Sequence, residues 1–129
     1  MKGGKLPRPT DAELAILRVL WRDGPCTVRQ VQEAPGRSGA MGYTTALKLL
    51  QIMVEKGLVD RDESRRSHVY RARLAEGETQ RQLVDDLMER AFGGSAERLV
   101  MQALASKRAT PEELDAIRRM IDELGGGDR

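Results

Sequence analysis

Apolar residues recur every three or four positions through the first 56 residues of the chain, in stretches separated by Gly and Pro. Thr10 and Thr27 each precede a Glu or Gln by three residues, which is the capping-box signature of a helix start. Gly57 follows the last apolar stretch and suits the left-handed residue that ends a helix. The pattern predicts three helices, over residues 11–22, 28–34 and 43–56.

After Gly57 the periodicity changes to that of β-strands. Residues 58–61 and 67–73 are predicted to form two short strands, with the polar run 62–66 as a hairpin loop. Three short helices followed by a hairpin is the element order of a winged helix-turn-helix domain. The Gly- and Ser-containing loop 36–42 between the second and third helices is longer than a tight turn.

The rest of the chain predicts three more helices, over residues 77–92, 96–105 (capped by Ser95) and 111–124. Their apolar stripes are narrow, and about 50 residues of this kind rarely bury enough surface to be stable alone. We therefore expect this half to pair with a second copy, although folding back on the first half is the alternative. The residues expected at the dimer contact are Leu83, Leu87, Phe92, Leu99, Val100, Leu104, Leu114, Ile117, Ile121 and Leu124.

The predicted fold is mainly α-helical with a small β-hairpin. It comprises a winged helix-turn-helix DNA-binding domain over residues 10–74 and a three-helix dimerisation domain over 75–124. Flexible tails are expected at residues 1–9 and 125–129.

The net charge of +2 conceals an uneven distribution along the chain. Residues 1–74 contain 14 Lys and Arg against 8 Asp and Glu, a net of +6. Residues 75–129 contain 8 against 12, a net of −4. The basic half is suited to a polyanion such as nucleic acid, although charge alone is equally consistent with two solvated surfaces of opposite sign.

The composition argues against several functional classes. Cys26 and His68 are each the only residue of their type, so an internal disulfide and a Cys/His metal site are excluded. No paired general acid and base and no Gly-rich phosphate loop are present, so we expect neither an enzyme nor a cofactor. Without a signal peptide or an apolar run of membrane-spanning length, the expected location is the cytoplasm.

The predicted third helix has an apolar stripe that includes Ala46 and Leu50 and an opposite face that would meet DNA. Residues near the start of a recognition helix reach base edges in the major groove. Thr hydroxyls can bond bases or phosphates, Lys can reach guanine or phosphate, and Gln can pair with adenine. An ordinary solvated helix face is the alternative. The residues assigned to this face as DNA contacts are Tyr43, Thr44, Thr45, Lys48 and Gln51.

Arg65 and Arg66 lie at the predicted hairpin tip, where two guanidinium groups suit phosphates or a narrow minor groove. A charged tip is also common in hairpins without any ligand. Weaker candidates for phosphate contact are Arg29, Lys56, Arg61 and Arg71. His68 near the tip could also bond a phosphate, although a single His on a strand is more often structural. Trp21 is expected in the core, with its indole N–H donating to a nearby carbonyl.

In their order and spacing, these motifs resemble the penicillinase-repressor family, which includes the methicillin-resistance regulator. The resemblance covers residues 10–124 and rests on Thr10–Glu13, Leu20-Trp21, Thr27–Val31, Tyr43–Thr45, Val54–Val59, His68–Tyr70, Phe92–Gly94, Leu99-Val100 and Leu114.

The resemblance implies a homodimeric transcriptional repressor that binds a palindromic operator through its winged helices. It also implies a membrane sensor with a metalloprotease domain, which responds to β-lactam or another envelope signal and cleaves the repressor in its C-terminal domain. The dipeptide cleaved in the best-known members is Asn-Phe and corresponds here to Gln102-Ala103. Ile52 stands where the family often has Arg, and the Cys-rich tail of the copper-responsive branch is absent.

These observations lead to the hypothesis of a DNA-binding repressor with no catalytic activity. The alternative is a winged-helix adaptor that binds a partner protein without sequence-specific DNA binding. That alternative would need an exposed apolar patch on the third helix, where Ile52 is the one apolar residue assigned to the outer face.

Overall fold

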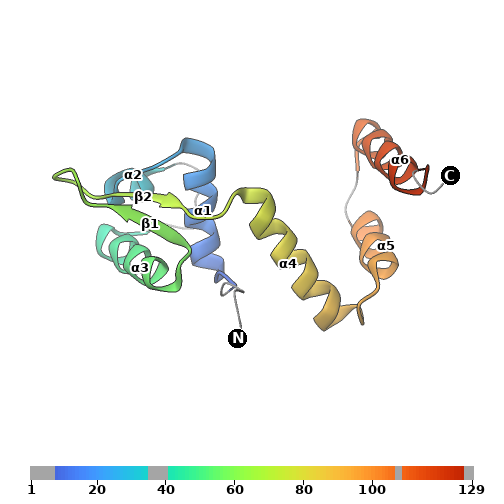
Figure 1. The fold of residues 1–129 in the computed structure, drawn as a ribbon, viewed down its shortest axis with the longest axis horizontal. Helices are drawn as coiled ribbons and strands as arrows, with labels where there is room; N and C mark the ends of the chain where they lie inside the picture. The colour runs from blue at the N-terminus through green and yellow to red at the C-terminus, as the bar shows by residue number, and fades with distance from the viewer. Residues whose placement is uncertain (1–7, 35–40, 107–108, 127–129) are drawn as a thin grey trace. The chain divides into compact units, whose positions relative to one another are not determined.

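The computed structural model describes residues 8–34, 41–106 and 109–126. Within these residues the elements, in chain order, are α1 (Asp11–Asp23), α2 (Val28–Glu33), α3 (Tyr43–Lys56), β1 (Val59–Asp62), β2 (Val69–Ala72), α4 (Glu76–Ala91), α5 (Ala96–Ser106) and α6 (Pro111–Gly126) (Figure 1). The chain divides into two compact units, Met1–Val84 and Asp85–Arg129, called here the N-terminal and C-terminal units. The division falls within α4.

Reciprocal capping bonds confirm the predicted starts of α1 and α2. Thr10 Oγ1 accepts from the Glu13 N–H at 3.2 Å, and Glu13 Oε1 accepts from the Thr10 N–H at 2.9 Å. Thr27 and Gln30 repeat the arrangement at 3.2 and 2.8 Å. Gly57 ends α3 with φ 84° and ψ 16°, the left-handed conformation expected of it.

The β-hairpin is confirmed, but its strands are displaced from the predicted ones. β1 and β2 are antiparallel, with Val59 opposite Ala72, and the connecting loop covers 63–68 rather than 62–66. Leu58 is excluded from β1 because its N–H closes the end of α3, donating to the Met53 carbonyl at 2.9 Å. The hairpin loop extends beyond α3 on the side away from α1 (Figure 1).

Cys26 adds a third backbone segment to the hairpin. Its N–H donates to the Tyr70 carbonyl at 2.9 Å, and the Tyr70 N–H donates to the Cys26 carbonyl at 2.8 Å. This isolated bridge anchors the α1–α2 connection to β2. A single paired residue leaves no periodic pattern in the sequence, so the bridge was not predictable from it.

One apolar core lies inside the N-terminal unit. Its buried members come from α1, α2, α3, the hairpin and the α1–α2 connection, and they are Ile16, Leu17, Val19, Leu20, Cys26, Val28, Val31, Ala46, Leu50, Met53, Leu58, Val59 and Tyr70. Trp21 packs partly buried against this core, and its indole N–H donates to the Leu74 carbonyl at 3.0 Å, as predicted.

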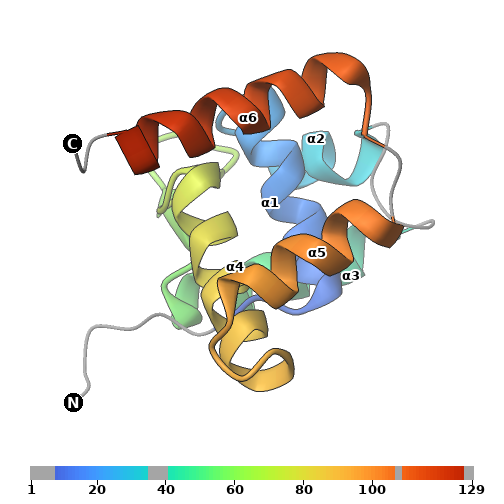
Figure 2. The same ribbon diagram turned by 90° about the vertical axis from the view of Figure 1, so that its right-hand side faces the viewer.

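The C-terminal unit contains the end of α4 together with α5 and α6, each of the last two continuous along its length (Figure 2). Ser95 Oγ accepts from the Arg98 N–H at 3.1 Å, and Thr110 and Glu113 form a third capping box. α6 continues through Gly126, beyond the predicted end at residue 124. No described side chain of α5 or α6 is buried, and no helix in the described segments is long and apolar enough to cross a membrane.

Candidate nucleic-acid interface

α3 presents a polar face opposite its buried one. Ala46, Leu50 and Met53 are fully buried, which leaves the other side of the helix to solvent. The predicted DNA contacts Thr44, Thr45, Lys48 and Gln51 are all exposed on it. In the part of the chain that the structure describes, no carboxylate lies within ion-pair distance of Lys48. Its ammonium group is therefore available to a polyanion.

The start of α3 brings Arg29 and Tyr43 together. The Arg29 guanidinium of α2 lies over the exposed Tyr43 ring, 5.9 Å from its centroid, which is within cation–π range. Arg29 also approaches Glu33 at 3.6 Å, as an exposed pair. The N-cap of α3 is Gly42, which has no side chain to accept a capping hydrogen bond, so the first N–H groups of the helix are left for water or a ligand.

Arg65 and Arg66 lie in the exposed hairpin loop, as predicted. The turn before them is shaped by Asp62, whose Oδ1 accepts from the Ser64 N–H at 2.9 Å. The backbone and side-chain hydrogen bonds from Ser64 lower the pKa of Asp62, so its carboxylate stays charged and keeps the turn in place.

Of the remaining weaker candidates for phosphate contact, two form ion pairs with carboxylates of the chain and two are exposed on the hairpin. Lys56 is engaged inside the fold, because its Nζ donates to Glu13 Oε1 at 3.0 Å and Oε2 at 2.8 Å. Arg61 pairs with Glu63 at 2.6 Å. His68 and Arg71 are exposed on the hairpin.

Glu13 is the principal feature that the sequence analysis missed. Its side chain is 2 % exposed, and burial by itself raises its pKa. Hydrogen bonds from Lys56 and Thr10, together with the Lys56 charge, outweigh burial, so the pKa of Glu13 is lowered. The capping box located Glu13 on the first turn of α1, but no sequence signal joined it to a lysine 43 positions later.

The apolar residues predicted for dimerisation remain largely uncovered in the single chain. Leu87, Val100, Leu104, Ile121 and Leu124 are exposed, by 41 to 69 %. The half-buried members are Leu83, Phe92, Leu99, Leu114 and Ile117.

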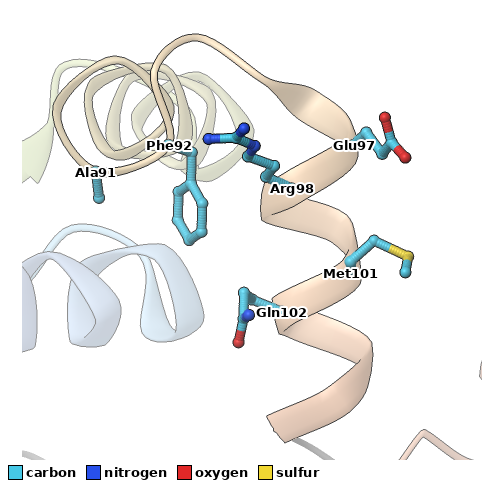
Figure 3. A pocket seen from close by; sticks show the side chains of 6 residues that line it. All are labelled: Ala91, Phe92, Glu97, Arg98, Met101 and Gln102. Carbon is cyan, nitrogen blue, oxygen red and sulfur yellow. The ribbon is translucent and has the colours of Figure 1, made fainter.

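A shallow groove of about 540 Å³ lies where α4 ends and α5 begins. Its lining residues are Ala91, Phe92, Glu97, Arg98, Met101 and Gln102. In Figure 3, Arg98 extends from α5 toward Phe92, and Gln102 lies on the same side of the helix. Gln102 and Ala103, the residues assigned to cleavage by resemblance, are both exposed within α5.

In the described segments, no group of three or more His, Cys, Asp or Glu side chains is placed to hold a metal ion. Cys26 is buried, and burial together with the nearby Asp23 carboxylate raises the pKa of its thiol, despite the opposing Arg22 charge. A thiol in this environment is a weak nucleophile.

Three helices and a hairpin around one core, with a polar helix face left open, define a winged helix-turn-helix protein. A family model described as "Penicillinase repressor" matches residues 9–123. The chain belongs to the penicillinase repressor family, whose members are transcriptional repressors rather than enzymes.

Individual relatives agree with this assignment. The chain is 35 % identical to "Transcriptional regulator BlaI" of Mycobacterium tuberculosis, over 95 % of this chain and 89 % of the relative. It is 20 % identical to "Penicillinase repressor" of Bacillus licheniformis, over 92 % and 93 %. Among solved structures, the monomeric form of B. licheniformis BlaI in complex with the blaP half-operator has a TM-score of 0.49 and 23 % identity, covering 57 % of this chain and 90 % of that one.

Proposed function

We propose that this protein represses transcription by binding, as a homodimer, to a palindromic DNA operator. The observation that carries the proposal is the polar face of α3, which is exposed along Thr44, Thr45, Lys48 and Gln51 while the other side of the helix is buried. In this proposal, α3 enters the major groove, and Arg29, Arg65 and Arg66 contact phosphates or the minor groove.

The dimer is supported by the apolar surface of the C-terminal unit. Met101, Met120, Ile121 and Leu124 are each more than half exposed, which is an unfavourable arrangement in water. A second copy would cover such side chains and place two reading helices on one body. Two linked half-site contacts then bind far more tightly than either alone, so separating the dimer releases the operator.

We also propose that the repressor is released by cleavage at Gln102-Ala103, the position that the family resemblance implies. Proteases act on opened chain, and α5 has no buried side chain whose exposure would oppose local opening. The proposed protease is the metalloprotease domain of a membrane sensor, responding to β-lactam or another envelope signal. Cutting α5 would remove α6 from the pairing surface and weaken the dimer.

The proposal is tested by mobility shift with a duplex that contains the promoter of the protein's own gene. We expect a retarded complex that weakens as salt increases and is not displaced by scrambled duplex. If scrambled DNA competes as well as the promoter, the chain is not an operator-binding repressor.

Three variants test which residues contact DNA. Lys48→Ala should weaken promoter binding more than binding to scrambled DNA. Arg65→Ala/Arg66→Ala should weaken both and reduce the salt slope by about 1 for each phosphate that is no longer neutralised. Arg118→Ala removes the same kind of charge from the C-terminal unit and should leave both affinities unchanged. A salt slope unaltered in the double variant would contradict a role of the hairpin loop.

The adaptor alternative gains no support from α3. Ile52 is half-buried, and the outer face of the helix is polar. An apolar docking surface for a partner protein would need exposed apolar side chains at these positions.

A further inference from the structure

A partly buried ion pair joins the first turn of α1 to the last turn of α3. Both oxygens of Glu13 accept from Lys56 Nζ, at 3.0 and 2.8 Å, and Oε1 also accepts from the Thr10 N–H at 2.9 Å. Glu13 is the one buried charged side chain among the described residues. Lys56 is itself 30 % exposed, so the pair lies at the margin of the core.

Stability alone does not account for such a pair. Burying the Glu13 carboxylate has a desolvation cost, and apolar residues of similar volume often stabilise a fold as well as or better than a buried ion pair does. A hydrogen-bonded pair adds a constraint on the relative position of the two helices, because its donor and acceptor atoms must meet within a few tenths of an ångström. Buried polar groups of this kind are known to select one arrangement of helices over others.

The apolar contacts of α3 lack that directional constraint. The helix rests on the core through Ala46, Leu50 and Met53, and the hydrophobic effect that holds these side chains is itself non-directional. Its polar attachments are at the ends, where Arg29 lies over Tyr43 and Glu13 bonds Lys56. These contacts constrain the rotation of α3 about its own axis.

Rotation of α3 determines where its polar face points. Lys48 and Lys56 are eight residues apart on one helix, so they lie about 12 Å apart along the axis and about 80° apart around it. A turn of the helix that breaks the Lys56 pair therefore also moves Lys48 sideways. Base recognition depends on this placement more strongly than phosphate attraction does.

We propose that Glu13 is a positioning residue for DNA reading: by holding Lys56, it sets the rotation of α3 and hence the discrimination between operator and other DNA. Glu13 acts from inside the fold and touches no DNA. The proposal rests on the proposed function.

The test uses the full chain and a duplex that the unaltered protein selects from a random pool. Glu13→Gln/Lys56→Met removes both charges, keeps the net charge, and retains a side-chain oxygen for the Thr10 cap. The measured quantity is the ratio of the dissociation constant for a scrambled duplex to that for the selected duplex, at one salt concentration. We expect this ratio to fall about tenfold, within the range for one mismatched base pair, while scrambled-duplex affinity stays the same.

The matched control is Asp60→Asn/Arg73→Met, which removes an exposed ion pair of 2.6 Å from the same unit. It also preserves net charge and should leave the ratio unchanged. Lys56→Arg keeps the pair and should retain most of the discrimination. Thermal unfolding of every variant establishes that binding is measured on folded protein; if the double variant is unfolded at the assay temperature, Glu13→Gln replaces it.

Each outcome has a defined consequence. A folded charge-removed variant with the unaltered ratio overturns the positioning role, because a merely structural pair changes stability and not discrimination. An equal fall in the control variant overturns it as well. If the unaltered protein selects no sequence from the pool, the proposed function fails, and this inference fails with it.

Discussion

The two units contain helices with the same local signals but very different surroundings. In the N-terminal unit, Thr27 and Gln30 cap a helix that packs into a core, whereas Thr110 and Glu113 cap α6 in the C-terminal unit with no described side chain of that helix buried. The described part of the chain buries 13 apolar side chains in its core cluster, and every one belongs to the N-terminal unit. Capping therefore marks where a helix starts, and burial shows which helices have a partner within the chain.

The difference has a thermodynamic meaning. Short helices are marginal in water by themselves, and most of their stability in proteins comes from packing of an apolar face. α1 to α3 obtain that packing from one another and from the hairpin. α5 and α6 leave large apolar side chains exposed, so we infer that their stability depends on a second copy and hence on protein concentration.

The largest expected effect comes from opening the N-terminal core. Leu50→Ala removes a side chain with no exposure and should lower the free energy of unfolding by about 3–4 kcal/mol. The fluorescence of Trp21, the single tryptophan of the sequence, reports this transition in urea. Leu124→Ala, at a side chain 69 % exposed, is the control and should leave the Trp21 transition in place. Equal losses in both variants would mean that the two units share one cooperative core.

The second-largest effect is expected on the stability of the proposed dimer. Leu104→Lys puts an unpaired charge into the proposed pairing surface of each copy and should weaken the dimer by about 3 kcal/mol, roughly a hundredfold. Sedimentation at micromolar concentration should change from dimer to monomer, with the Trp21 transition unaltered. Glu89→Lys, at an exposed and already charged position of the same unit, should remain a dimer. A Leu104→Lys protein that still sediments as a dimer would place the contact elsewhere.

Features that depend on local contacts were predictable from the sequence, and features that depend on contacts between distant segments were not. The starts of α1, α2 and α6 were predictable because a capping box lies within four residues, and Gly57 marked the end of α3 for a similarly local reason. The indole bond of Trp21 was predictable in kind, since a buried N–H needs an acceptor, although Leu74 was not identified as that acceptor.

What escaped prediction depends on contacts between distant segments. The bridge of Cys26 to Tyr70 and the pairing of Glu13 with Lys56 join residues more than 40 positions apart, and neither leaves a periodic signal. The strand boundaries were wrong by one or two residues, and at the start of β1 the reason is that the Leu58 N–H is used by the end of α3. The exposed polar face of α3 was anticipated because the buried stripe of the same helix implies its opposite.

Loss of a capping box should have a smaller effect on stability, and this effect should differ between the two units. Thr27→Ala and Thr110→Ala each remove one capping box and should cost about 1 kcal/mol locally. In the N-terminal unit this loss should appear in the cooperative Trp21 transition. In the C-terminal unit it should appear as faster amide exchange confined to α6, most clearly in a monomeric background such as Leu104→Lys. If Thr110→Ala shifts the Trp21 transition as much as Thr27→Ala does, α6 is coupled to the N-terminal core.

The smallest stability effects come from two matched ion pairs at i,i+4 spacing. Arg29–Glu33 at 3.6 Å lies on α2, and Arg90–Asp86 at 3.1 Å lies on α4. Arg29→Gln and Arg90→Gln should each change the free energy of unfolding by about 0.5 kcal/mol or less, because exposed pairs are screened by water and salt.

The effects of these two variants on DNA binding should nevertheless differ. Arg29 lies over Tyr43 at the start of α3, so its removal should reduce the salt slope of DNA binding by about 1, while Arg90→Gln leaves the slope unchanged. Equal salt slopes for the two variants would mean that Arg29 does not contact DNA. The DNA-binding surface would then be limited to α3 and the hairpin loop.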